Sequence, residues 1–190
     1  QASYALIKTE KELSETPEEM MNWIAGAEFA DSIGADIINS SLGYSTFDDP
    51  NDDYSVSDLD GRTSIISLGA LAAARTGMLV VTSAGNAGGS SWDKLTFPAD
   101  ADSIRTVGSV TQYGVASSFS SRGYTVDGRV KPNVCARGEG AVVYRSDGTL
   151  AYANGTSFSS PIMAGAAACL WSAVPDATAQ EVIEALEVSA

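Results

Sequence analysis

The hydrophobic and polar positions in the first half of the chain follow two alternating patterns. Near-continuous apolar runs at 36–43 and 78–86 predict strands covered on both faces, as in a parallel sheet. Apolar residues recur at helical spacing over 16–34 and 62–77, and Gly34 and Gly77 supply the expected helix ends. Further strands are expected at 3–8, 103–110 and 130–136.

Local signals at the ends of elements support these boundaries. Thr16, Pro17 and Glu19 form a capping-box sequence with proline at the first helical position. Thr178 and Glu181 repeat the capping box before a last helix over 178–186. Residues 140–155 predict a hairpin that turns at Asp147-Gly148, and a helix rich in small residues follows it.

Strands that alternate with helices through long connections favour parallel strands with crossover helices. The sequence therefore predicts an α/β fold, namely a three-layer sandwich with a mostly parallel sheet. Residues 1–190 show no repeat and no linker, so we expect a single structural unit.

Composition excludes several classes of function. The net charge of −13 argues against a nucleic-acid partner, because phosphates need a basic surface. No apolar run reaches the roughly 18 residues of a membrane span, and the first residues lack a signal-peptide pattern, although such a peptide could have been removed. Cys135 and Cys169 are expected to be buried free thiols. The absence of histidine removes the usual general base and metal ligand.

Polar residues gather where the predicted strands end. Segments 41–43 (SLG) and 83–86 (SAGN) follow two strands, and ligands bind beyond the carboxyl ends of parallel strands. Ser157 begins a helix, whose free N–H groups favour negative charge. An acyl-transfer site needs a nucleophile, donors to the oxyanion and a general base. A serine hydroxyl, a side-chain amide and a helix N-terminus on one rim would supply the first two, and the general base is missing.

Six motifs in order make the family resemblance plain. They are GADIINSSLG, GMLVVTSAGN, FPADADSIRTVGSV, SFSSRG, GRVKPNVCARG and NGTSFSSPIMAG. The chain resembles the subtilisin-like serine peptidases, the subtilases, and most closely their branch in Bacteroidetes bacteria. The resemblance implies a subtilisin-like fold that lacks its N-terminal strands, and a parent endopeptidase that forms an acyl-enzyme. It also implies a secreted, periplasmic or cell-surface location.

The resemblance assigns roles to individual residues. Ser157 matches the nucleophile, and Asn86 matches the side-chain donor to the oxyanion. Ser41, Leu42 and Gly43 match the strand that pairs with the substrate backbone. The remaining matches are a pocket wall at Ser83, Ala84 and Gly85, a pocket floor near Thr96, and a cis peptide at Phe97–Pro98. No metal ligand is implied.

The triad aspartate and histidine of the family precede the segment where this chain begins, so we expect the chain alone to be inactive. The missing aspartate would end a strand between 3–8 and 36–43, and its absence would expose sheet edges. Segment 3–8 is then expected to close onto the neighbouring strand, to be displaced, or to pair with another molecule. A peptide or protein substrate is the expected partner, and self-association through the exposed edges is a further possibility.

Alternatives stay open at several positions. Ser157 alone could be a helix N-cap, and Asn86 could be a turn residue. The whole chain could be a natural pseudoenzyme or peptide-binding module with a subtilase fold. The acidic loop Asp48–Asp60 holds six aspartates, which favour either a solvated surface loop or calcium. No other cofactor is expected.

Overall fold

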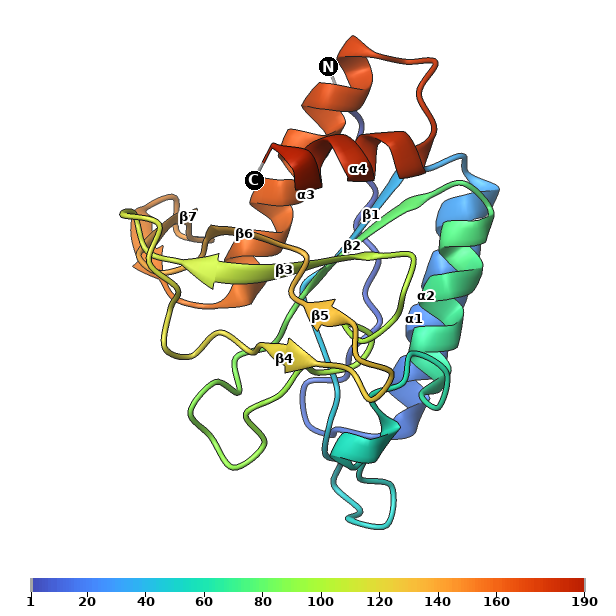
Figure 1. Ribbon diagram of the computed structural model, residues 1–190, viewed down its shortest axis with the longest axis vertical. Coiled ribbons are helices and arrows are strands. Elements are labelled where there is room, and N and C mark those ends of the chain that lie inside the picture. Colours follow the sequence, from blue (N-terminus) through green and yellow to red (C-terminus); the bar gives the residue numbers. More distant parts are fainter. Residues whose placement is uncertain (1, 190) are drawn as a thin grey trace.

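A four-stranded parallel sheet forms the centre of the computed structural model, which describes residues 2–189 (Figure 1). Its order is β1-β2-β3-β6, with β1 at Ile37–Ser40, β2 at Leu79–Ser83, β3 at Arg105–Val110 and β6 at Val134–Arg137. Every pair is parallel, and the register runs from Ile37 opposite Leu79 to Val110 opposite Arg137. The predicted parallel sheet is confirmed.

Helices cover both faces of this sheet. Helices α1 (Pro17–Ser32) and α2 (Ile65–Arg75) lie on one face, while α3 (Thr156–Ala173) and α4 (Ala179–Val188) lie on the other (Figure 1). Alternate residues of β2 enter the two cores, because Val80 packs with the first pair of helices and Val81 with the second. The three-layer sandwich is therefore confirmed.

The helix ends follow the local signals. The Glu19 carboxylate accepts a hydrogen bond from Thr16 N–H at 3.1 Å, and Glu181 accepts one from Thr178 N–H at 2.7 Å. Gly77, which follows α2, has a φ of 100°, a left-handed conformation that glycine tolerates best. Sequence signals thus locate these helix ends to within a few residues.

Short elements complete the fold. The hairpin of β7 (Ala141–Tyr144) and β8 (Leu150–Ala153) is present, as predicted. Two further strands, β4 (Gly123–Tyr124) and β5 (Val130–Lys131), pair antiparallel, and a 3-10 turn covers Val56–Asp58. The predicted single strand at 130–136 is wrong, because Pro132 has no N–H for a ladder and separates β5 from β6. The peptide at Phe97–Pro98 is cis, as the resemblance implies.

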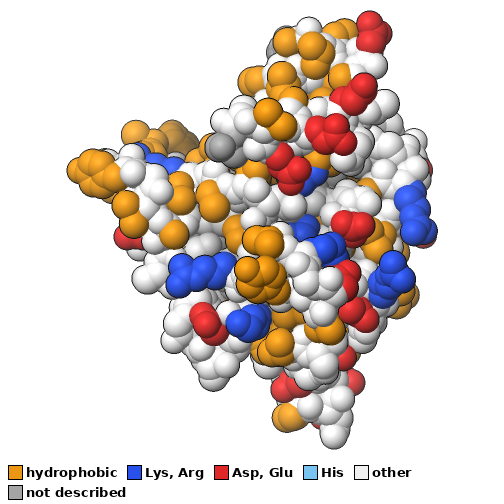
Figure 2. Space-filling view, in the orientation of Figure 1, with side chains coloured by type: hydrophobic (Ala, Val, Ile, Leu, Met, Phe, Trp, Pro, Cys, Tyr) orange, Lys and Arg blue, Asp and Glu red, His pale blue; other side chains and the backbone are white. Residues whose placement is uncertain are grey.

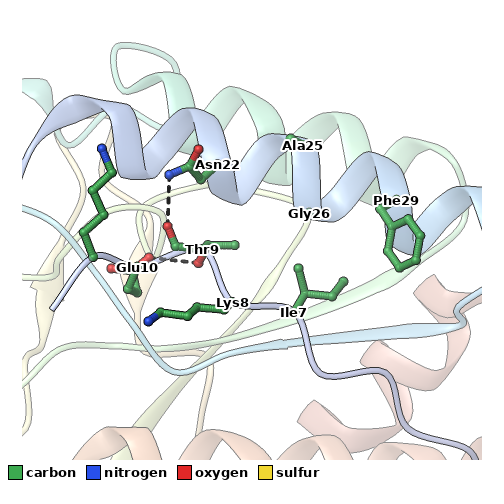
Figure 3. Close-up of a pocket in the computed structure, with 9 residues that line it drawn as sticks. Ile7, Lys8, Thr9, Glu10, Asn22, Ala25, Gly26 and Phe29 are labelled. Carbon is green, nitrogen blue, oxygen red and sulfur yellow. Dashed lines mark hydrogen bonds between the residues drawn. The ribbon is translucent and has the colours of Figure 1, made fainter.

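The prediction of a strand at 3–8 is also wrong. Residues 3–8 are exposed, and only the end of the segment lies beside α1, where a Cβ on Gly26 would come within 3.1 Å of Ile7 Cγ2. Asn22 Nδ2 donates to Thr9 O at 3.2 Å, and a shallow cavity of about 460 Å³ lies between the segment and the helix (Figure 3). A strand needs a ladder partner, and this segment contacts a helix instead, so displacement is the outcome observed.

Both cysteines are free and exposed, so the prediction that they are buried is wrong. Cys169 lies on the outward side of α3, beside the exposed residues Gly165 and Ala166. Cys135 lies on β6, an edge strand of the sheet. Apolar sequence neighbours did not indicate which side of each element meets the core.

Candidate active site

Two segments that lie far apart in the sequence meet at the start of α3. The Ser157 hydroxyl donates to the Ser41 carbonyl oxygen at 3.1 Å. The Ser41 hydroxyl donates back to the Ser157 carbonyl oxygen at 2.9 Å. This reciprocal pair holds the chain beyond β1 against the first turn of α3, and both serines are half-buried.

Asn86 lies on the same rim, just after β2. Its Oδ1 accepts hydrogen bonds from Thr156 N at 2.8 Å and from Thr156 Oγ1 at 3.0 Å. Gly85 N donates to that same hydroxyl at 3.2 Å. Because Oδ1 is held by the residue before Ser157, the amide nitrogen Nδ2 is left without an acceptor among the described residues. An exposed donor therefore stands beside the Ser157 turn.

Gly43, Gly85 and Thr96 pack closely beside this rim. A Cβ on Gly43 would lie 2.2 Å from Thr96 Oγ1, and one on Gly85 would lie 2.7 Å from it. The Thr96 hydroxyl is buried and has no hydrogen-bond partner among the described residues. The Thr96 side chain thus fills the space between two segments that only glycine can line.

The other predicted binding residues lie in the same region but are mostly enclosed. Ser83 and Ala84 are buried, and Ser83 Oγ donates to Leu42 O at 3.4 Å. Leu42 is half-buried and packs against the core beneath α1 and α2. Ser83 and Ala84 can therefore meet a ligand mainly through their backbone, whereas Ser41 and Leu42 are half-buried and Gly43 is exposed.

The comparisons with known proteins agree with this arrangement. The model of the subtilase family, Peptidase_S8, matches residues 3–190. The chain belongs to the subtilase family. It is 34% identical to subtilisin E of Bacillus subtilis strain 168 over 182 residues, covering 95% of this chain and 42% of that protein. It is 33% identical to subtilisin DY of Bacillus licheniformis over 168 residues, covering 88% of this chain and 54% of that protein.

Solved subtilase structures share the fold. The self-cleaved protease domain of PatA matches with a TM-score of 0.70 and 28% identity, covering 87% of this chain and 57% of that one. A cold-adapted subtilisin-like serine proteinase matches with a TM-score of 0.70 and 23% identity, covering 89% and 54% respectively. The chain therefore has a subtilisin-like fold and spans about half the length of the relatives it matches. The closer resemblance to Bacteroidetes members stays a prediction.

Sequence reasoning missed two polar residues of the subtilase rim. Ser160 Oγ donates to Asn39 Oδ1 at 2.8 Å, and Asn39 Nδ2 donates to Ser41 Oγ at 3.2 Å. Through Ser41, these bonds reach the Ser157 carbonyl. The available signal was spacing, because Ser160 lies one helical turn after Ser157 and Asn39 lies two residues before Ser41.

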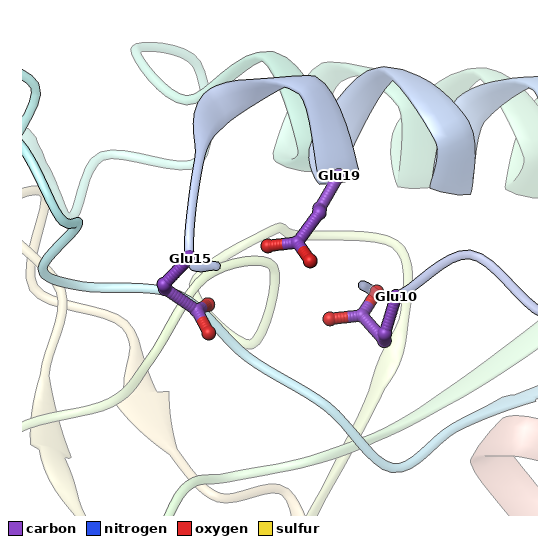
Figure 4. Close-up of side chains that lie close together, drawn as sticks. All are labelled: Glu10, Glu15 and Glu19. Carbon is purple, nitrogen blue, oxygen red and sulfur yellow. The ribbon is translucent and has the colours of Figure 1, made fainter. Parts of the chain in front are cut away.

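Acidic side chains gather in the loop Asp48–Asp60 and near the start of α1. In the loop Asp48–Asp60, Asp53 accepts from Phe47 N at 2.6 Å and Asp60 accepts from Arg62 N at 2.7 Å, so local backbone groups engage these carboxylates. Among the described residues, one group of three or more possible metal ligands is found, and its three glutamates have carboxylate oxygens within 4.8 Å of one another (Figure 4). These are Glu10, Glu15 and Glu19.

Protein donors already engage that glutamate group. The Glu19 carboxylate accepts from Lys11 N at 2.7 Å, and Glu10 accepts from the Tyr44 hydroxyl at 2.6 Å. Burial raises the pKa of Glu15, and the negative charges of Glu19, Glu10 and Asp48 add to that rise. Two of the three carboxylates are therefore already engaged by hydrogen-bond donors of the protein. Among residues 2–189, no helix is both long and apolar enough to cross a membrane.

Proposed function

We propose that this chain is the part of a subtilisin-like serine endopeptidase that carries the nucleophile and the oxyanion donor. Ser157 Oγ would attack the peptide carbonyl and form an acyl-enzyme. Asn86 Nδ2 and the Ser157 N–H would donate to the oxyanion that develops. The observation that carries the proposal is the pair of hydrogen bonds from Thr156 to Asn86 Oδ1, which leaves Nδ2 free beside Ser157.

The substrate would be a peptide or protein segment in extended form. Ser41 to Gly43 would pair with its backbone, as added strands do, and Ser83 to Gly85 would form the opposite wall. Thr96 would close the floor between Gly43 and Gly85, where its side chain already fills the space. Secretion or display at the cell surface is part of this proposal and rests on the resemblance.

The chain alone would be inactive because it has no base. The acceptor of the Ser157 proton is the Ser41 carbonyl, which cannot take up a proton at neutral pH, and the sequence contains no histidine. Removing the histidine of subtilisin costs about 10⁶-fold in kcat, and a deficit of that order is expected here. The triad aspartate and histidine would come from chain that precedes Gln1 in the parent protein.

Two surfaces are suited to receive that preceding chain. Strand β1 is an edge of the described sheet, so one side of it is open to a further strand. Next to it, α3 exposes Ile162, Gly165, Ala166 and Cys169, a stripe at helical spacing. The open edge of β1 would also allow two copies of this chain to pair when nothing else covers it.

Labelling by a fluorophosphonate tests the proposal directly. The chain alone should not react, whereas a version extended upstream through Asp-x-Gly and His-Gly-Thr motifs should be labelled on Ser157 and should cleave casein. Ser157→Ala should abolish labelling of the extended protein, while Ser172→Ala, on the exposed side of α3, should leave it intact. Strong labelling of the present chain would refute the proposed inactivity.

The alternative is a pseudoenzyme that binds peptides without cleaving them. It would be favoured if the upstream sequence lacked both motifs and peptides still bound in a manner sensitive to Gly43→Ala.

Calcium at Asp48–Asp60 also stays a proposal. A rise in melting temperature at millimolar calcium, lost in Asp53→Asn, would support it.

A further inference from the structure

The hairpin of β7 and β8 exposes an apolar face. Val142 lies opposite Tyr152, and Tyr144 lies opposite Leu150, so these four side chains share one side of the hairpin. Their exposed fractions are 57%, 77%, 74% and 71% in that order. Figure 2 shows apolar side chains along the left edge of the molecule, where both this hairpin and the turn after β3 lie in Figure 1. The alternate side chains, among them the buried Ala141, are mostly small and face the body of the protein.

This distribution is the reverse of the usual one, in which large apolar residues face the core. The four side chains together expose on the order of 500 Å², which matches the largest apolar patch of a typical monomer. Such patches often mark interaction surfaces when they are contiguous. The hairpin pairs these residues across its two strands, so the patch is contiguous.

We propose that this face pairs with the same face of a second copy of the chain. Two such faces would bury roughly 1,000 Å² in total, about the least that a specific interface needs. A two-fold axis would set the hairpins antiparallel, so that the turn of each lies over the base of the other. The four residues of this face carry no charge, so the contact between two copies would be apolar throughout.

The hairpin is less suited to a lipid surface. Its tip, 145–148, reads Arg-Ser-Asp-Gly, so insertion would bury Asp147 at the leading end. A chain with a net charge of −13 is also repelled by anionic lipid. The same repulsion acts between two copies, so added salt should tighten the dimer, whereas it would loosen binding to charged lipid.

Sedimentation equilibrium at about 5 to 500 micromolar tests the proposal, since an interface of this size is expected to be micromolar or weaker. The test variant is Tyr144→Lys with Tyr152→Lys. Its matched control is Tyr4→Lys with Tyr124→Lys, whose side chains are 88% and 69% exposed and lie outside the hairpin. The wild type and the control should dimerise equally, and the hairpin variant should do so at least tenfold more weakly. Circular dichroism should show all three folded alike.

Several results would overturn the proposal. One is a wild type that stays monomeric throughout, and another is a hairpin variant that dimerises like the control. In the second case, slower amide hydrogen exchange at residues 37–40 as the protein concentration rises would show that the copies associate through β1 instead. Hairpin-dependent sedimentation with phosphatidylserine vesicles would point to a membrane. None of these measurements involves catalysis, so they leave the proposed peptidase function untouched.

Discussion

The buried side chain of Lys131 allows a direct test of how burying a charged group changes folding stability. The side chain is 3% exposed, and its Nζ donates to Asn133 Oδ1 at 2.9 Å and to Thr106 Oγ1 at 3.2 Å. Neither acceptor is charged. Burial therefore lowers the pKa of Lys131 to about 7, helped by the positive charges of Arg105 and Arg129 and partly opposed by two acidic groups, Asp102 and Asp100.

The direction of the pH dependence follows from proton uptake. Between about 7 and 10.5 the unfolded chain holds the Lys131 proton and the folded chain does not, so folding stability rises with pH through that window. As the pH falls towards 7, the stability gained through Lys131 is lost. Below pH 7 the side chain is protonated in both states, so its contribution to folding stability no longer changes. Each pH unit inside the window corresponds to about 1.4 kcal/mol, so two units give about 3 kcal/mol.

Urea denaturation at pH 7 and pH 9 measures this difference. Comparing the wild type with Lys131→Met cancels the other groups that titrate in the same range. The wild type should gain about 2 to 3 kcal/mol more than the variant on going to the higher pH, and the variant should be the more stable of the two at pH 7. Equal gains in the two proteins would refute the assignment of a lowered pKa to Lys131.

Three further predictions concern the rim and the last helix. Gly43→Ala should lower the free energy of unfolding by about 1 to 3 kcal/mol, because the added methyl group collides with Thr96. In the double variant, Thr96→Gly should restore most of that loss. Additive losses of the two substitutions in urea denaturation would contradict this explanation. Asn86→Ala should lower the free energy of thermal unfolding by about 1 to 3 kcal/mol, because it leaves the Thr156 N–H without its acceptor. Asn86→Asp keeps an acceptor oxygen and should lower it by less. Equal losses would argue that Asn86 does not stabilise the fold as an acceptor. Glu187→Gln removes the negative charge that pairs with the buried Arg105, so amide hydrogen exchange in α4 should become faster. The free energy of unfolding should fall by about 1 to 2 kcal/mol, a modest loss because Glu187 is itself partly exposed. Unchanged exchange would show that this ion pair does not anchor α4.

The sequence predicted what depends on local pattern. The continuous apolar run at 78–86 identified β2 because both faces of this strand are covered, and capping residues such as Thr16 located helix ends. It failed where the outcome depends on distant partners. Segment 3–8 has the composition of a strand but packs on α1 at Gly26. The bonds that join Asn39 to Ser160 link residues 121 positions apart, and no periodicity records such a contact.

The central strand β2 has a consequence for the candidate site. All five of its residues are buried, and neighbours such as Val80 and Val81 point into opposite layers. Loss of either layer would strip half of this strand's packing, so the two layers should melt together as one cooperative transition. Asn86 follows β2 while Ser157 opens α3, and a partly folded chain would therefore hold the two groups in no fixed relation.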